Sequence, residues 1–149
     1  MRRTDLRQAS TEAVYCLDTD VLSAVIKPSP PLHLIRRLAR TPPTEQCTTA
    51  ITLGELLYGV RRRRSPELAA RVRDLIASAG PILPFDEAAA QSYGPLRASL
   101  EREGRRLAEP DLRIAAIVLS REATLVTGNV RHFARVPGLH VENWLTDGT

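Results

Sequence analysis

Short apolar runs alternate with segments of helical periodicity along most of this 149-residue chain. The runs with the length and composition of buried strands are residues 13–17, 47–51, 82–85, 124–127 and 139–143. The segments with helical spacing are residues 21–26, 32–40, 52–60, 66–79, 86–103 and a nearly all-apolar one from residue 109. Strands that alternate with helices form a parallel sheet covered on both faces. The sequence therefore predicts an α/β fold of three α/β/α layers, with a mainly parallel central sheet of about four to five strands.

The first apolar run ends abruptly in two carboxylates, Asp18 and Asp20, on either side of Thr19. In open α/β sheets, ligands bind beyond the carboxyl ends of the strands, so this acidic pair lies where chemistry is usually done. A second interpretation is equally open, because an aspartate at this position also caps a following helix.

Three further polar residues lie beside apolar elements: Glu55, Asp111 and Asn129. Each also has a purely structural explanation. Thr52 and Glu55 match an S/T-x-x-E capping box, in which the glutamate bonds back to the start of its helix. The helix dipole favours Asp111 in a first turn, and Asn129 suits a turn. Because strand ends and the starts of the following helices share one edge of a parallel sheet, we expect these side chains to converge there with Asp18.

Unpaired carboxylates that share an edge repel one another and raise one another's pKa values unless a cation neutralises them. Oxygen ligands of this kind suit Mg²⁺ or Mn²⁺, which bind through a few carboxylates, waters and substrate phosphates. A zinc pattern is absent from the sequence, since His33, His132 and His140 are scattered and surface-like. The pattern therefore indicates a cation site that activates water and stabilises charge on a phosphodiester.

Length and composition fit one domain, residues 13–149, preceded by a loose extension at residues 1–12. No apolar run approaches the ~20 residues of a membrane span, and the start lacks the apolar stretch of a signal peptide. Cys16 and Cys47 share no motif and are expected to be buried, reduced thiols. These features predict a cytoplasmic protein with no membrane partner. The net charge of +4, carried almost wholly by arginine, favours a polyanionic partner such as RNA.

The chain carries six motifs in a fixed order along nearly its whole length. They are LDTDVLS at residues 17–23, ITLGELLYG at 51–59, LPFD at 83–86, DLRIAA at 111–116, LVTGNVRHF at 125–133 and VPGL at 136–139. Any one of them is weakly specific, but the ordered set is specific. Together they resemble the PIN-domain ribonucleases and, among these, the VapC-like toxins of type II VapBC toxin–antitoxin pairs.

The resemblance implies a role for each matching residue. It assigns the catalytic acids that hold a divalent cation, Mg²⁺ or Mn²⁺, to Asp18, Glu55 and Asp111. It assigns a weaker fourth metal position to Asn129. The residues placed to orient these carboxylates or the attacking water are Thr19, Asp20 and Thr127. Glu109, which precedes the third acid, is expected to cap its helix rather than join the acidic edge.

The activity implied by the resemblance is that of a metal-dependent endoribonuclease, which cuts single-stranded regions of tRNA, rRNA or mRNA. Such a protein acts as a growth-inhibiting toxin, forms a homodimer and is neutralised by a cognate VapB-like antitoxin. The candidate contacts to RNA phosphates are Arg61, Arg62, Arg63, Arg64, Arg105 and Arg106. A solvated, non-binding face is the alternative for any one of these arginines.

Three other functions remain open on the sequence. LDTDV at residues 17–21 fits the opening motif of haloacid-dehalogenase-type phosphatases, but these enzymes need a later lysine, and Lys27 is the only lysine here. A degenerate PIN module that binds RNA or antitoxin without cutting is a second alternative. A housekeeping RNA-processing PIN nuclease is the third.

Overall fold

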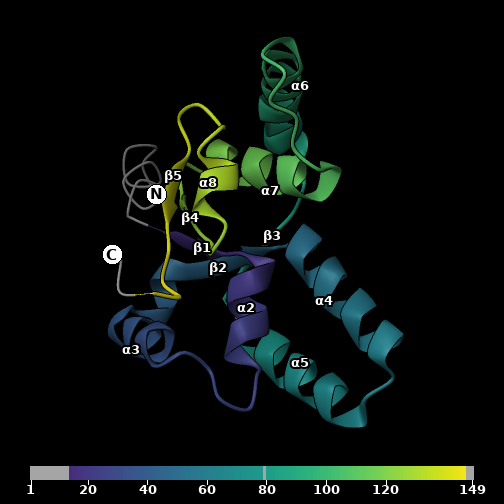
Figure 1. The fold of residues 1–149 in the computed structure, drawn as a ribbon, viewed down its shortest axis with the longest axis vertical. Helices are drawn as coiled ribbons and strands as arrows, with labels where there is room; N and C mark the ends of the chain where they lie inside the picture. The colour runs from purple at the N-terminus through teal and green to yellow at the C-terminus, as the bar shows by residue number, and fades with distance from the viewer. Residues whose placement is uncertain (1–13, 79, 147–149) are drawn as a thin grey trace, which may run out of the picture.

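The computed structural model describes residues 14–78 and 80–146, so the extension expected at residues 1–12 lies outside the described residues. Within this part of the chain, five strands form one parallel sheet in the order β3-β2-β1-β4-β5 (Figure 1). The strands are β1 (Tyr15–Leu17), β2 (Gln46–Thr49), β3 (Ile82–Leu83), β4 (Thr124–Val126) and β5 (His140–Glu142). The predicted parallel sheet is confirmed, and each strand is shorter than the apolar run that predicted it.

Helices cover both faces of this sheet, which confirms the expected three layers. They are α2 (Thr19–Val25), α3 (Leu32–Arg40), α4 (Ala50–Arg63), α5 (Pro66–Ser78), α6 (Glu87–Arg102), α7 (Glu109–Ser120) and α8 (Val130–Phe133), with a short 3₁₀ helix η1 (Pro43–Glu45) before β2. Figure 1 shows α6, α7 and α8 on one side of the sheet and α2, α3 and α5 on the other. None of the helices in the described residues is long and apolar enough to cross a membrane.

β1 lies at the centre of the sheet and pairs with a neighbour on each side. Tyr15 is in register with Gln46 of β2 and with Thr124 of β4. The chain first builds the side of the sheet that holds β2 and β3, and then crosses to add β4 and β5 on the other side. Ligands of open α/β sheets bind where the strand order reverses in this way, beyond the carboxyl ends of the strands. The topology therefore points to the ends of β1 and β4.

The helix after β1 begins two residues earlier than predicted, because Asp18 caps it. Asp18 occupies the N-cap of α2, and its Oδ1 accepts the Thr19 N–H at 2.8 Å. The cap brings Thr19 and Asp20 into the first turn of α2. The capping interpretation of Asp18 is thus correct, and it leaves the second carboxylate oxygen for other partners.

The helix after β2 also begins early, and here the predicted capping box is wrong. Thr49 is the N-cap of α4, with its hydroxyl accepting the Thr52 N–H at 3.0 Å. Glu55 therefore lies in the second turn, too far along the helix to bond back to its start. The helix continues through the arginines to residue 63 and ends at Arg64, whose φ of 52° is left-handed.

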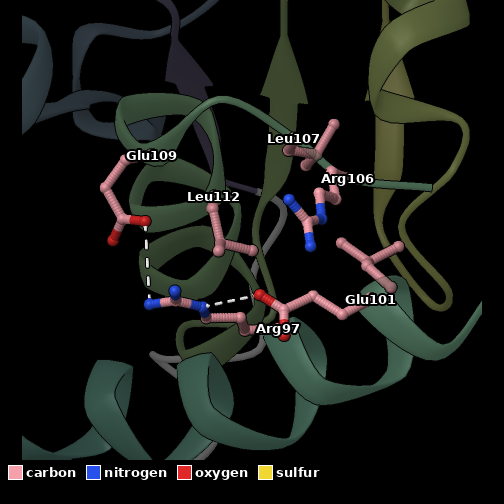
Figure 2. A pocket seen from close by; sticks show the side chains of 7 residues that line it. Arg97, Glu101, Arg106, Leu107, Glu109 and Leu112 are labelled. Carbon is pink, nitrogen blue, oxygen red and sulfur yellow. Dashed lines mark hydrogen bonds and ion pairs between the residues drawn. The ribbon is translucent and has the colours of Figure 1, made fainter. Parts of the chain in front are cut away.

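A polar cluster around Glu109 joins α6 to the first turn of α7. Glu109 accepts hydrogen bonds from the Tyr93 hydroxyl and from Arg113 Nε (3.0 Å), and its other oxygen lies 3.9 Å from Arg97. Figure 2 shows the Arg97 guanidinium reaching across to Glu109 from α6. The expectation that Glu109 caps α7 is wrong, because the N-cap position is Ala108, which makes no side-chain cap bond. Its contacts instead fasten the start of α7, which carries Asp111, to α6.

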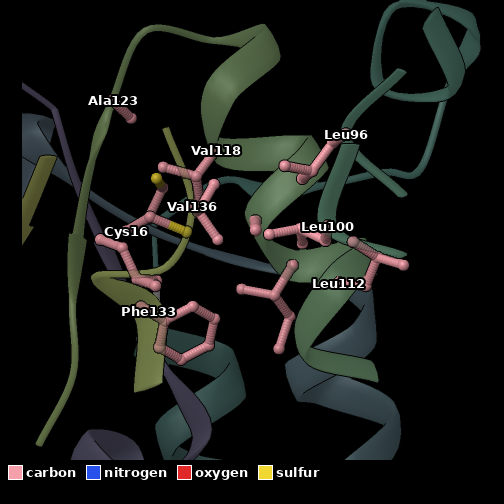
Figure 3. Packing of buried hydrophobic residues seen from close by; sticks show 12 residues of the cluster. Cys16, Leu96, Leu100, Leu112, Val118, Ala123, Phe133 and Val136 are labelled. Atoms are coloured by element: carbon pink, nitrogen blue, oxygen red, sulfur yellow. The ribbon is translucent and has the colours of Figure 1, made fainter. Parts of the chain in front are cut away.

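Two apolar cores lie on opposite faces of the sheet. Figure 3 shows the first, where Leu100 of α6 and Phe133 of α8 pack with side chains of α7 and of the central strands. The second core packs α2, α3, α4 and α5 against the other face. Successive residues of a strand point to opposite faces, so Cys16 lies in the first core and Leu17 in the second. Cys16 and Cys47 are buried free thiols, as expected.

Candidate active site

The carboxyl ends of β1 and β4 place Asp18 directly beside Thr127. The Asp18 N–H donates to Val126 O at 2.9 Å, which extends the pairing of the two strands by one residue. The Thr127 hydroxyl donates to Asp18 Oδ2 at 2.9 Å, while Oδ1 is held by the Thr19 N–H. Both oxygens of Asp18 are thus fixed in position by groups at the ends of the two strands.

Asp20 lies beside this pair at the surface. Its Oδ2 accepts the Gly128 N–H at 2.9 Å, and its Oδ1 lies 3.3 Å from Thr127 Oγ1. A Cβ on Gly128 would lie 2.9 Å from Asp20 Oδ2 and 2.5 Å from Leu145 Cδ1. A larger residue at position 128 would therefore require the side-chain ends of Asp20 and Leu145 to move.

Asp18 is a buried carboxylate, with 6% of its surface exposed. Burial raises the pKa of its carboxyl to about 6, against the hydrogen bonds from Thr19 and Thr127, which lower it. The negative charges of Asp20 and Asp111 raise this pKa further. No arginine, lysine or histidine within residues 14–78 and 80–146 forms an ion pair with Asp18. The carboxylate is therefore costly to ionise in the absence of a cation.

Glu55 reaches the same edge from α4. Its Oε1 accepts a hydrogen bond of 2.6 Å from the Thr19 hydroxyl. Behind Thr19, the fully buried Thr52 hydroxyl lies 3.2 Å from Thr19 Oγ1 and 3.3 Å from Thr49 Oγ1. A line of threonine hydroxyls thus connects the end of β2 to Glu55 and fixes where its carboxylate lies.

Asp111, in the first turn of α7, is held by His132 of α8. His132 Nε2 lies 3.0 Å from Asp111 Oδ2, and both side chains are partly buried. The negative charge of Asp111 is one of the causes that raise the pKa of Asp18, after burial and the charge of Asp20. Sequence reasoning missed His132 because it had no visible partner. Twenty-one residues separate the two side chains, and only the packing of α8 beside α7 brings them together.

The remaining predicted residues are less closely joined to this group. Asn129 contacts it through its backbone, since the Asn129 N–H donates to Thr127 Oγ1 at 3.1 Å, while its exposed side chain makes no cap to α8. The two predicted arginine clusters are exposed and separate from each other. Arg61–Arg64 ends α4, whereas Arg105 and Arg106 lie between α6 and α7, with Arg106 beside the Glu109 cluster in Figure 2.

The donor set fits a hard divalent cation. Glu55 is bonded to Thr19, the residue after Asp18, and the negative charge of Asp111 raises the pKa of Asp18, so the three acids lie at one edge of the sheet. Among the described residues, no cationic side chain pairs with the buried Asp18. Within the described part of the chain, no three carboxylate, imidazole or thiol side chains lie close enough together to hold a metal ion by themselves. Mg²⁺ needs no such cage, because it binds through one or two carboxylates and keeps several waters. The residues therefore fit Mg²⁺ or Mn²⁺ better than a metal that requires a full set of protein ligands.

Comparison with known proteins places this arrangement in a family. Residues 15–139 match the PIN domain family. The chain belongs to that family. The tRNA(fMet)-specific endonuclease VapC of Shigella flexneri is 35% identical over 130 residues, which are 87% of this chain and 97% of that protein. Ribonuclease VapC2 of Haemophilus influenzae is 34% identical over 131 residues, 88% of this chain and 98% of its own.

The structure of this PIN domain agrees with the family match. The DNA-bound VapBC complex of Salmonella typhimurium contains a chain that superposes with a TM-score of 0.79 at 32% identity, covering 89% of this chain and 98% of that one. The predicted resemblance to the VapC-like branch of the PIN family is confirmed. The interpretation as a dehalogenase-type phosphatase is wrong, since the family match covers the LDTDV motif itself.

The contact between Thr19 and Glu55 allows charge and geometry to be separated. In Glu55→Gln, the amide oxygen still accepts from the Thr19 hydroxyl, so we expect an unchanged melting temperature but RNA cleavage lowered by at least about a hundredfold. Thr19→Val removes the donor and leaves the charge, and we expect a loss of about 10–100-fold, typical of groups that orient a ligand. Single-turnover cleavage rates and thermal melts measure both. Glu87→Gln, an exposed isosteric change in α6, is the control. Full activity in Glu55→Gln would assign this glutamate a structural role.

Proposed function

We propose that this PIN domain is a metal-dependent endoribonuclease that cuts single-stranded regions of RNA and acts as a growth-inhibiting toxin neutralised by a cognate VapB-like antitoxin. The observation that carries the proposal is the buried Asp18, fixed by Thr127 and Thr19 at the reversal point of the sheet beside Glu55 and Asp111. The similarity to ribonucleases named VapC supports the choice of RNA as substrate.

The site residues have distinct roles in this proposal. Asp18, Glu55 and Asp111 would hold Mg²⁺ or Mn²⁺, with Asn129 as a weaker fourth candidate. When bound, the cation supplies an activated water and neutralises charge that develops on the phosphodiester. The chain's contribution is to fix its acids before substrate arrives. Thr127 orients Asp18 and Thr19 orients Glu55, so little reorganisation is needed during the reaction.

The proposed toxin role concerns the partner of this protein and the compartment in which it acts. The Salmonella typhimurium relative was solved as a VapBC complex, which supports an antitoxin as the partner of this chain. An acidic site that binds cations is readily blocked by a basic side chain of such a partner. We place the protein in the cytoplasm, where its buried free thiols stay reduced, and the homodimer stays a prediction from the family resemblance.

The proposal is tested with purified, antitoxin-free protein and total cellular RNA. Reactions run with Mg²⁺, with Mn²⁺ or with a chelator, and new RNA ends are mapped by sequencing. We expect discrete cuts in unpaired regions that require the divalent cation. Cell growth is followed in parallel, and we expect arrest on expression and recovery when the antitoxin is co-expressed. Folded protein that makes no cation-dependent cut in any RNA would overturn the nuclease proposal in favour of a module that only binds.

A further inference from the structure

A groove of about 270 Å³ leads away from the catalytic edge between α2, α4 and α5. Thr19 and Glu55 lie at one end of it, so the groove is continuous with the proposed active site. Further along its lining lie Arg63 at the end of α4, Arg71 of α5, and Lys27 in the turn that follows α2. The active-site edge and the three basic side chains therefore belong to one continuous surface.

The spacing of residues along α4 gives the distance between the acidic end and the basic end of this groove. Glu55, Gly59 and Arg63 are four residues apart in succession and lie on one face of α4. At a rise of about 1.5 Å per residue, Arg63 lies about 12 Å along the helix from Glu55. Arg71 crosses from α5, and its Nη1 donates to Ile26 O at the end of α2 at 3.3 Å. The basic end of the groove is thus held at a defined distance from the acidic end.

The basic end of the groove carries three positive side chains. Among the described residues, Lys27, Arg63 and Arg71 form no ion pair with a carboxylate. The walls between them are aliphatic, from side chains such as Leu56 and Val72. A surface with free cations at one end and aliphatic walls matches a chain of alternating phosphates and flat, partly apolar bases.

We propose that this groove binds the segment of single-stranded RNA that adjoins the scissile phosphate, with Lys27, Arg63 and Arg71 contacting its phosphates. The inference rests on the proposed ribonuclease function and adds where the substrate lies. It selects one arginine, Arg63, from the predicted cluster and adds two cations that the sequence did not indicate. The aliphatic walls contact bases without stacking on rings, since no aromatic side chain is among the described residues that line the groove.

Two other occupants fit the groove less well. The volume of about 270 Å³ lies close to the lower end of the range for small-molecule pockets, about 300–1,000 Å³, so it is the basic lining rather than the size that favours part of a negatively charged polymer. A partner helix docks through a row of apolar anchors, and three unpaired cations at one end of the groove do not favour such an apolar row. Extended RNA matches the charge of the groove and its aliphatic walls.

The test measures RNA binding separately from cleavage. All proteins carry Asp18→Asn so that RNA stays intact, and a short 5′-fluorescein-labelled single-stranded RNA of mixed sequence is titrated by fluorescence anisotropy. The groove variant is Lys27→Gln/Arg63→Gln/Arg71→Gln. The control is Arg36→Gln/Arg40→Gln/Arg73→Gln, which removes the same charge from exposed positions on α3 and α5 outside the groove. Thermal melts establish that both triple variants are folded, and Arg71→Lys tests whether charge alone restores binding at that position.

We expect the groove variant to bind RNA about tenfold more weakly and the control to bind within about twofold of its parent. Removing three phosphate contacts from a single strand should also flatten the slope of log affinity against log salt by about 2, between about 50 and 200 mM salt. Equal losses in the two variants, or none in the groove variant, would overturn the proposal. So would a groove variant that binds RNA normally but no longer co-purifies with antitoxin, because the groove would then be a protein-binding surface. RNA cleavage by the wild-type protein is measured alongside. If the wild type cleaves RNA and the groove variant binds RNA as tightly as its parent, this inference fails while the proposed ribonuclease function stands.

Discussion

Asp18→Asn is expected to lower the rate of RNA cleavage by at least about a thousandfold. The substitution removes the charge of the buried carboxylate but keeps an oxygen that accepts the Thr19 N–H, so the N-cap of α2 is retained. The remaining acids, Glu55 and Asp111, are held from other helices and cannot take its place between the two strand ends. Single-turnover cleavage at saturating Mg²⁺ measures the loss directly.

The interpretation depends on the variant being folded. Far-UV circular dichroism and a thermal melt establish this, and Glu87→Gln serves again as a carboxylate-to-amide control on an exposed surface. Cleavage within about tenfold of wild type would show that Asp18 only caps its helix, since a cap alone has no effect on chemistry. Loss of growth arrest in cells should accompany the loss of cleavage.

The same substitution is expected to stabilise the cation-free protein at neutral and alkaline pH. The pKa of Asp18 is about 6 in the folded chain and 3.8 in its ordinary state. A raised carboxyl pKa contributes stability that is fully present below pH 4 and is lost as pH rises through 6. By pH 8 the cost of ionising Asp18 is about 3 kcal/mol. Asparagine never ionises, so the stability of Asp18→Asn relative to wild type should rise by about that amount between pH 4 and pH 8.

Thermal or urea unfolding across this pH range, in the presence of a chelator, measures the effect. A difference of about 3 kcal/mol corresponds to roughly 6–12 °C in melting temperature for a domain of this size. Adding Mg²⁺ at pH 8 should raise the melting temperature of wild type by mass action and leave Asp18→Asn unmoved. If the stabilities of the two proteins changed with pH in the same way, the pKa of Asp18 would not be raised by burial. The argument that this carboxylate needs a neutralising cation would then fail.

The bounds of a helix were predictable where the local sequence pattern determines them. The helix at residues 32–40 was predicted with the bounds it has, because prolines stop it on both sides. The start of α4 was not predicted correctly. Thr49 and Thr52 can both cap a helix, but only Thr52 begins an S/T-x-x-E pattern, so the sequence favoured the wrong threonine. The choice is made by the sheet, where Thr49 still pairs with Leu83 of β3 and the helix follows at once.

The positions of the candidate acids in the fold were predictable from the sequence, but their contacts were not. The expectation that Asp18, Glu55 and Asp111 share one edge followed from the rule that parallel strands end together. Contacts between residues that are far apart in the chain could not be predicted from the sequence. His132 reaches Asp111 only after α8 packs beside α7, and Glu109 is drawn to Tyr93 of α6 instead of capping its own helix. Such pairings depend on how helices pack, which neither spacing nor composition encodes.

The central position of β1 has a consequence for how such a protein is kept inactive. The backbone of Asp18 is hydrogen-bonded into the middle of a five-stranded sheet, through the Val126 carbonyl. Segments with this bonding open only when the whole domain unfolds, in contrast to loops and edge strands, which open locally. We therefore expect the backbone of Asp18 to keep its position in the free protein, ready for activity. Inhibition by a molecule that covers the catalytic edge suits such a site, and we expect activity to return without a refolding step when that molecule is removed.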